Sequence, residues 1–347
     1  IDITNLPHDY FGGVDTYSRG LIDGFYKSDS NTEYQIYLNK NYFLKRRFKE
    51  KKNFNFFIIE QSSFKKVSFK IYNRIFPYIS IILFDYKYCV DFYCRNYFNS
   101  DFKKIVKKNS DILVVPNTYL SFYDLKLKTI LNIHDLQHLH FSENFSKHEF
   151  LMRNYQYYNS AKYSSKLISS SNFIKKDLLK NYKFLKKKDI SVITEGVNLK
   201  QFNNNLKTKK TNNFFFPAQL WSHKNHKLVV DAFKYLDKNL KIKANLLFCG
   251  KKFEKSNELF EYIKKNKIHN VKYLGLVSFQ KLKKLYKESY CVLCPAIYES
   301  SSLTLLEAIA SKTSVIASDN KPNIEKKKIF KINIFKKNDL ENLVGVL

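Results

Sequence analysis

The sequence predicts an α/β protein with two doubly wound domains, each a parallel sheet covered by helices. Its 347 residues exceed what one hydrophobic core usually serves. Short apolar runs alternate with amphipathic helical patterns along both halves, as in βα units. A polar stretch rich in Asn and Lys, residues 194–213, separates the halves. We therefore expect an N-terminal domain over residues 1–195, a linker over 196–212 and a C-terminal domain over 213–347.

The first half contains six apolar runs with the length and composition of strands. Helical patterns lie between several of them, for example at residues 148–165. The predicted strands cover residues 34–39, 54–60, 111–117, 128–135, 166–172 and 189–196.

The second half repeats this alternation more clearly. Strands are predicted at residues 212–219, 243–250, 271–277, 290–298 and 313–319. The helices between them are predicted at residues 226–236, 257–266, 279–289 and 302–311. Ligands of doubly wound sheets bind beyond the carboxyl ends of the strands. We therefore expect a cleft between the domains, with functional residues in the loops that follow strands.

The composition is that of a globular protein, with 44% hydrophobic and 27% charged residues. The longest apolar run, residues 78–84, is much shorter than the ~18–20 residues that span a bilayer. We find no signal peptide. The chain begins at Ile1 and ends within a helical pattern at Leu347, so we expect a fragment clipped at both ends.

The cysteines favour a reducing compartment, because there are five of them in a long chain. Cys291 and Cys294 have C-x-x-C spacing, but no second pair or His cluster lies nearby. We interpret them as part of a buried strand rather than as a metal or redox site.

The net charge is +30, from 61 Lys and Arg against 31 Asp and Glu. Such a balance fits a nucleic-acid partner or an anionic membrane surface. It also fits solvated lysines encoded by AT-rich codons, because Asn, Ile, Phe and Tyr are abundant too, while Gly and Pro are scarce. No zinc module or RNA-binding aromatic motif is present, so nucleic acid is not the expected partner.

A doubled glycine, Gly12-Gly13, precedes an amphipathic helical pattern in a chain that has only eight glycines. Such a loop lets backbone N–H groups approach a phosphate at a helix N-terminus. It lacks the third glycine of G-x-G-x-x-G and the Lys-Ser/Thr of a P-loop. The alternative is an ordinary tight turn.

Two further loops carry candidate side chains. His134 follows the predicted strand 128–135, where it is placed to hydrogen-bond a sugar hydroxyl or to serve as a structural loop histidine. Lys224 lies in the loop PAQLWSHKNH, residues 217–226, between His223 and His226. A lysine in this position is suited to pairing with a diphosphate.

The stretch YESSSLTLLEAIAS, residues 298–311, follows the strand that Pro295 ends. We expect Glu299 on the loop and the serines at 300–302 to cap the next helix, donating N–H and O–H groups to an anion. Glu307 lies about two turns into this helix and returns to the face of Glu299. A buried carboxylate there accepts from two vicinal hydroxyls, which is the geometry of the ribose O2 and O3.

These residues resemble a known family. Glu299 and Glu307 match the E-x7-E motif of the retaining GT-B glycosyltransferases of family 4. Four other features agree with that family in order and spacing: Gly12-Gly13, NIHDLQHLHF (132–141), EGVNLKQF (195–202) and PAQLWSHKNHK (217–227). The resemblance spans nearly the whole chain, and the combination is more specific than any single piece.

The resemblance implies a GT-B fold, with two Rossmann-like domains facing a central cleft, and retaining transfer of a hexose from a nucleotide sugar. Catalytic roles fall to His134, Glu299 and Lys224. Donor-binding roles fall to Gly12, Gly13, Gln219, His223, Ser301, Ser302, Leu303 and Glu307. Glu307 would hold the ribose, Lys224 would neutralise the diphosphate, and His134 would face the transferring sugar. Because no D-x-D motif is present, no metal and no other cofactor is expected.

The sequence also departs from the family pattern. Gln219 stands near the place of an Arg that many members carry, which leaves Lys224, with His223 or Arg19, to supply positive charge. The first strand and the closing C-terminal helix are expected to be missing.

The expected donor is GDP-mannose, and the expected acceptor is a glycan or lipid-linked glycan of a bacterial surface polysaccharide. Residues 40–57 mix cations with aromatics, which fits attraction to an anionic membrane as well as a plain surface loop. We expect a cytoplasmic protein, peripheral on the inner face of the cytoplasmic membrane. The alternatives are a GT-B-like sugar-nucleotide epimerase, which would turn over its donor without an acceptor, and a basic nucleic-acid-binding protein.

Overall fold

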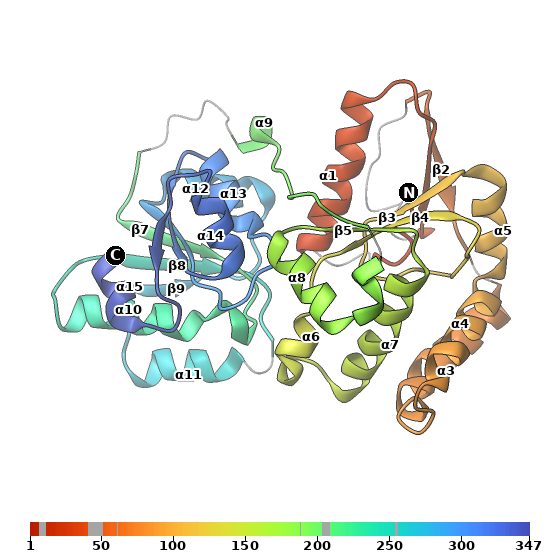
Figure 1. The fold of residues 1–347 in the computed structure, drawn as a ribbon. Coiled ribbons are helices and arrows are strands. Elements are labelled where there is room, and N and C mark those ends of the chain that lie inside the picture. Colours follow the sequence, from red (N-terminus) through yellow and green to blue (C-terminus); the bar gives the residue numbers. More distant parts are fainter. Residues whose placement is uncertain (7–11, 41–50, 61, 188, 203–208, 254–255) are drawn as a thin grey trace. The chain divides into compact units, whose positions relative to one another are not determined.

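The computed structural model describes residues 1–6, 12–40, 51–60, 62–187, 189–202, 209–253 and 256–347 (Figure 1). The chain forms two compact units, Ile1–Thr194 and Glu195–Leu347. Part of the stretch between the predicted domains belongs to the second unit. The short helix α9 (Leu199–Phe202) places Phe202 in the core of that unit.

The N-terminal unit contains parallel strands in two groups. Strands β1 and β2 form one pair, and the other four form a sheet in the order β3-β4-β5-β6. The bounds are β1 (Tyr34–Leu38), β2 (Phe54–Ile58), β3 (Ile112–Val115), β4 (Lys128–Ile133), β5 (Lys166–Ser169) and β6 (Ile190–Val192). Each lies within a predicted strand, so all six predictions are confirmed.

A short extended segment at Ile1–Ile3 joins the two groups. The Ile3 N–H donates to the Tyr37 carbonyl of β1, and the Asp2 N–H donates to the Val114 carbonyl of β3, both at 2.9 Å. The segment therefore takes the position of a central strand.

Helices of the N-terminal unit connect these strands. They are α1 (Gly13–Ser28), α3 (Ser63–Ile79), α4 (Tyr86–Phe98), α5 (Ser100–Asn109), α6 (Gln137–His140), α7 (Lys147–Tyr163) and α8 (Asn172–Asn181), with 3-10 turns η1 (Ser142–Asn144) and η2 (Lys183–Lys187). Helix α7 begins with a capping box in which Ser146 and Glu149 each accept from the other's backbone N–H. The segment 41–50, most of the predicted cationic and aromatic stretch, lies outside the described residues.

The C-terminal unit has a six-stranded parallel sheet in the order β12-β11-β10-β7-β8-β9. The bounds are β7 (Asn213–Pro217), β8 (Asn245–Cys249), β9 (Val271–Tyr273), β10 (Cys291–Cys294), β11 (Ser314–Ser318) and β12 (Asn333–Phe335). Read from β9, this is the 3-2-1-4-5-6 order of a Rossmann fold. Cys291 and Cys294 are free and buried in β10, as predicted.

Helices cover both faces of this sheet (Figure 1). They are α10 (His226–Lys238), α11 (Asn257–Lys265), α12 (Phe279–Glu288), α13 (Leu303–Ala310), α14 (Lys321–Lys327) and α15 (Leu340–Val346), with α9 and the 3-10 turn η3 (Ser222–Lys224). Alternate strand residues supply the two cores. Phe214 and Phe216 pack with α10, whereas Phe215 packs with α12 and α13.

None of the described helices is both long and apolar enough to cross a bilayer.

Candidate active site

The candidate site lies at the point where the strand order of the C-terminal sheet reverses. Strands β7 and β10 are neighbours there, with Phe214 opposite Cys291 in parallel register. The connections that leave these two strands diverge to opposite sides of the sheet, so a crevice forms at their carboxyl ends. Both candidate loops, after β7 and after β10, therefore meet at this edge.

A small hollow at this edge brings several predicted residues together. The loop after β7 contributes Lys224, and the segment after β10 contributes Glu299, Ser302 and Thr304. The hydroxyl of Thr304 donates to the Pro217 carbonyl at 3.3 Å, which ties the start of α13 to the end of β7.

Lys224 and Glu299 form an ion pair across this hollow. Lys224 Nζ lies 2.6 Å from Glu299 Oε1, and the two side chains are 19% and 18% exposed. The sequence analysis assigned both to catalysis from separate loops, and the structure places them in direct contact. Because half-buried charges are weakly screened, the pair fixes the position of the ammonium group.

Glu307, on α13, is partly buried and accepts a hydrogen bond from Tyr286. The Tyr286 hydroxyl donates to Glu307 Oε2 at 2.6 Å, and Tyr286 itself is fully buried on α12. Burial raises the pKa of Glu307 to about 7, against the opposing effect of the Tyr286 hydrogen bond. The pKa of this carboxyl group therefore lies close to neutral pH.

The charged side chains all surround the end of β10. Burial raises the pKa of the Cys294 thiol well above its usual value, and the carboxylates of Glu299 and Glu307 raise it further while Lys224 opposes them. The charges of Lys224, Glu299 and Glu307 therefore all act on the buried end of β10. An anion with adjacent hydroxyls, such as a nucleoside diphosphate, presents matching groups to this arrangement.

The serines before α13 differ from the prediction. Ser302 occupies the N-cap position, but its side chain does not cap the helix, and its backbone is left-handed at φ 57°. Its hydroxyl donates to Asn323 Oδ1 at 2.6 Å instead. The hydroxyl of Ser301 donates to the carboxylate of Glu195. The expectation that the Ser302 side chain caps the helix is therefore wrong. Both hydroxyls have acceptors within the protein, and the first-turn N–H groups, beginning with that of Leu303, remain as donors.

Gln219 and His223 have roles within the loop after β7. The indole N–H of Trp221 donates to Gln219 Oε1 at 3.0 Å. Burial and the charge of Lys224 lower the pKa of His223 to about 2, so its imidazole is neutral near pH 7. A neutral imidazole adds no positive charge, so the lowered pKa of His223 favours Lys224 as the cation of this loop.

Gly250, at the end of β8, belongs to the same edge and was not predicted. Its φ is +149°, and a Cβ at this residue would lie 2.1 Å from the carbonyl oxygen of Ala218. Only glycine permits this close approach of two backbones. Its position after a predicted strand, in a chain with few glycines, was the available signal.

The remaining candidates belong to the N-terminal unit. His134 follows β4 and is 5% exposed, and its Nε2 donates to the Pro116 carbonyl at 2.8 Å. Gly12 is the N-cap of α1 and Gly13 its first residue, so the glycine pair opens a helix as predicted. Arg19 lies on α1, and its Nη1 atom is 3.9 Å from Asp15 Oδ2.

Among the residues that the structure describes, no group of three or more His, Cys, Asp and Glu side chains is placed to hold a metal ion.

Comparison with known proteins bears on the C-terminal unit. Residues 197–343 match the family of glycosyl transferases group 1. This match covers most of the C-terminal unit, Glu195–Leu347. It contains both members of the Lys224–Glu299 pair as well as Glu307.

Two curated relatives match part of this chain. The O-antigen chain mannosyltransferase RfbU of Salmonella typhimurium is 28% identical over 222 residues, which cover 62% of this chain and 59% of the relative. An uncharacterized glycosyltransferase of Methanocaldococcus jannaschii is 28% identical over 148 residues, covering 37% and 36%. The matches thus span less than two thirds of the relatives' length.

Solved structures resemble nearly the whole chain. HepE of Anabaena, solved with UDP-glucose, has a TM-score of 0.65 at 11% identity, covering 99% of this chain and 87% of that one. WaaG, a glycosyltransferase involved in lipopolysaccharide biosynthesis, has a TM-score of 0.62 at 13% identity, covering 99% and 88%. At such identities the likeness concerns the fold, which is GT-B, as predicted.

Proposed function

We propose that this protein is a retaining glycosyltransferase of family 4, which moves a hexose from a nucleotide sugar to a glycan or lipid-linked acceptor during polysaccharide synthesis. One observation carries the proposal. The Lys224–Glu299 ion pair lies where β7 and β10 are neighbours, at the switch point of the sheet, and Glu307 follows on α13 within residues 197–343, which match the family of glycosyl transferases group 1.

The donor is bound by groups that match its parts. Glu307 accepts hydrogen bonds from the two ribose hydroxyls, while Tyr286 holds the second carboxylate oxygen. The diphosphate takes the ammonium group of Lys224 and the first-turn N–H groups of α13. Glu299 then lies beside the sugar.

The reaction breaks the bond between the anomeric carbon and the diphosphate oxygen. The acceptor hydroxyl attacks the anomeric carbon from the same face, and its proton passes to the departing phosphate oxygen. Stabilising the charge on that phosphate is the catalytic task, and Lys224 performs it without a metal ion. His134 and the Gly12-Gly13 turn belong to the N-terminal unit, and their roles toward the sugar and the diphosphate rest on the family resemblance alone.

GDP-mannose is the proposed donor. The name of RfbU, a mannosyltransferase, supports mannose, whereas HepE was solved with UDP-glucose. The two possibilities differ in the base, so binding of GDP, UDP, ADP and dTDP, measured by calorimetry, separates them. We expect the acceptor to be presented at the cytoplasmic face of the membrane.

The deciding experiment tests the ribose contact. Glu307→Ala should weaken GDP binding at least about tenfold, because hydrogen bonds to a charged group contribute about 1.5–3 kcal/mol each. Removing one ribose hydroxyl, in 2′-deoxy-GDP, should weaken binding to the wild type but have much less effect on Glu307→Ala. Glu261→Ala, at an exposed position of α11, is the matched control.

Two results would contradict the proposal. If the change from GDP to 2′-deoxy-GDP weakens binding equally in the wild type and in Glu307→Ala, Glu307 does not contact the ribose. Conversion of the sugar nucleotide into its epimer without any acceptor would identify an epimerase instead.

A further inference from the structure

An extended apolar surface lies on the N-terminal unit and includes none of the residues assigned a role above. Of the large apolar side chains that are exposed in the described residues, half lie between Phe64 and Tyr97. They belong to α3, α4 and the connection between these helices, which run side by side at one edge of the unit (Figure 1). Single exposed apolar residues are ordinary, but a contiguous group marks an interaction surface.

Helix α3 has two apolar faces, although packing within the unit needs only one. The inner face carries Tyr72 and Phe76, whose rings stack 4.8 Å apart, and Phe76 meets Tyr155 of α7 at 5.1 Å. The outer face runs along positions 64, 67, 71, 75 and 78, spaced three or four residues apart. Side chains at these positions are between 48% and 74% exposed.

The connection after α3 extends this surface. Ile82 and Phe84 are 75% and 77% exposed, among the largest values of the group. A loop tip that presents two bulky apolar side chains to water costs solvation free energy unless another phase receives them.

Positive charge borders the apolar surface. Lys66, Lys70 and Arg74 are exposed on α3, on the flank of the outer face that is turned away from the inner one. Asp85 and Asp91 are the only acidic residues between positions 62 and 99, and Asp91 is buried. The surface is therefore apolar in its centre and cationic at its margin.

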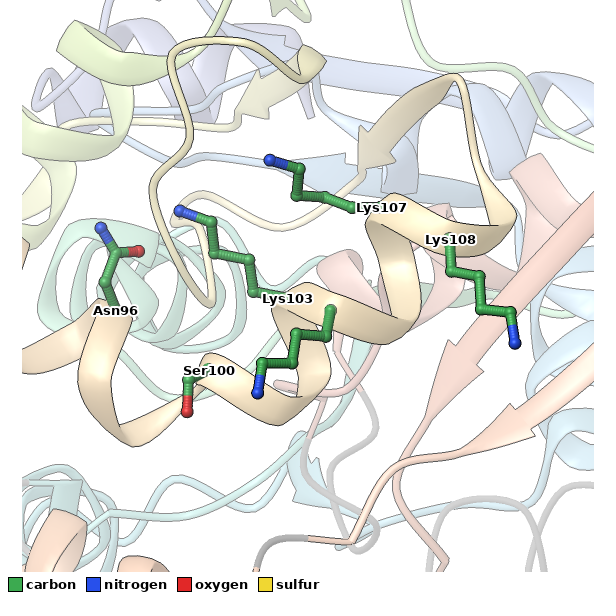
Figure 2. Close-up of a pocket in the computed structure, with 6 residues that line it drawn as sticks. Asn96, Ser100, Lys103, Lys107 and Lys108 are labelled. Carbon is green, nitrogen blue, oxygen red and sulfur yellow. The ribbon is translucent and has the colours of Figure 1, made fainter.

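The neighbouring helix α5 adds further cations. A hollow of about 580 Å³ is lined by Asn96, Ser100, Lys103, Lys104, Lys107 and Lys108. Lys103 and Lys107 point to one side of α5 and Lys108 to the other (Figure 2). Asp124 Oδ2 lies 3.1 Å and 3.2 Å from the Nζ atoms of Lys103 and Lys107, so one carboxylate serves two of the four lysines.

We propose that α3, α4 and residues 80–85 dock on the surface of an anionic lipid bilayer. The outer apolar face lies at the boundary of headgroups and acyl chains, and the bordering lysines contact the headgroups. A second copy of this chain fits the apolar centre less well, because two cationic margins would face each other. This inference does not depend on the proposed transferase activity.

Vesicle sedimentation tests the proposal with the full chain. The protein should bind vesicles of phosphatidylcholine mixed with phosphatidylglycerol, and bind vesicles of phosphatidylcholine alone much more weakly. The double variant Ile82→Glu/Phe84→Glu should lose about tenfold or more in binding. Lys66→Glu/Lys70→Glu should lose a similar factor, and salt should weaken the wild type.

Two matched controls separate this surface from the overall charge of +30. Ile329→Glu replaces an apolar residue of the C-terminal unit that is 75% exposed, and Lys264→Glu/Lys265→Glu reverses two exposed lysines of α11. Both should bind as the wild type does. Equal losses in the controls, or no binding to anionic vesicles at low salt, would overturn the proposal. So would a dimer that Ile82→Glu/Phe84→Glu dissociates. GDP binding by calorimetry should be unchanged in every variant, which keeps this test separate from that of the active site.

Discussion

The hydroxyl of Tyr286 on α12 donates to the carboxylate of Glu307 on α13 at 2.6 Å, and Tyr286 is fully buried while Glu307 is partly buried. Tyr286 thereby uses one carboxylate oxygen and fixes the orientation of the other. We predict that Tyr286→Phe weakens GDP binding several-fold, through loss of this orientation, since a single hydrogen bond to a charged group contributes about 1.5–3 kcal/mol.

Because Phe fills nearly the same volume, the fold should survive Tyr286→Phe, which circular dichroism and thermal melting would verify. A role in positioning Glu307, rather than in packing alone, requires that Tyr286→Phe has little further effect in a Glu307→Ala background. Additive losses in the double variant would refute it.

Donor binding should depend on pH through Glu307. Its pKa is raised to about 7, and the ribose hydroxyls need the ionised carboxylate as an acceptor. GDP affinity should therefore fall as the pH drops from about 8 to about 6, by up to tenfold per unit below the pKa. Phosphate ionisation changes over the same range, so the informative quantity is the difference between the wild type and Glu307→Gln. Parallel pH profiles would contradict the prediction.

The raised pKa of Glu307 also makes the stability of the fold depend on pH, but in the opposite direction, because stability falls as the pH rises. The folded state favours the protonated carboxyl, so its contribution to stability is fully present below the usual Glu pKa of about 4.3 and is lost as the pH rises through about 7. The wild type should lose stability relative to Glu307→Gln over this interval. Chemical denaturation at a series of pH values measures the difference.

The ion pair between Lys224 and Glu299 predicts opposite effects of its two members on diphosphate binding. Glu299→Gln should tighten GDP binding up to about fivefold, because it frees the ammonium group from a pair of about 1 kcal/mol. Lys224→Met should weaken GDP binding and slow transfer. If Glu299→Gln and Lys224→Met weaken binding alike, the lysine does not serve the diphosphate. Lys227→Met, on an exposed lysine of α10, is the control.

Gly250→Ala should destabilise the C-terminal unit by about 3 kcal/mol or more. The substitution adds a Cβ 2.1 Å from the Ala218 carbonyl oxygen and strains a backbone with φ +149°. Thermal melting should show a drop of several degrees. Gly20→Ala is the control, because no atom lies within 4 Å of its added Cβ and α1 gains helix propensity. An unchanged melting point for Gly250→Ala would show that the two loops separate at little cost.

Much of the sheet architecture follows from local sequence. The strands of both units were predictable because buried parallel strands are short apolar runs bounded by polar turns. The meeting of Lys224 and Glu299 was also within reach, since residues that follow neighbouring parallel strands share one edge of the sheet. β12 (Asn333–Phe335) was missed because Lys331, Asn333 and Lys336 interrupt its apolar residues, so no continuous apolar run marks it.

The errors concern partners that are distant in sequence. Ser301 and Ser302 looked like helix caps, but Glu195 and Asn323 compete for their hydroxyl groups, and no local pattern reveals either acceptor. Tyr286 could not be assigned either, because an aromatic residue on an amphipathic helix reads as core. The exposed face of α3 was hidden for a similar reason, since its apolar residues are indistinguishable from core residues until the fold shows which face is covered.

The edge of the C-terminal sheet has a consequence for how specificity changes. Lys224, Glu299 and the first turn of α13 stand on connections, whereas β7 and β10 beneath them are held by a core of phenylalanine and aliphatic side chains. Substitutions in residues 218–226 and 295–302 alter the groups that face a ligand while leaving that core intact. Laboratory evolution aimed at a new sugar should therefore concentrate its libraries on these two connections and tolerate broad diversity there.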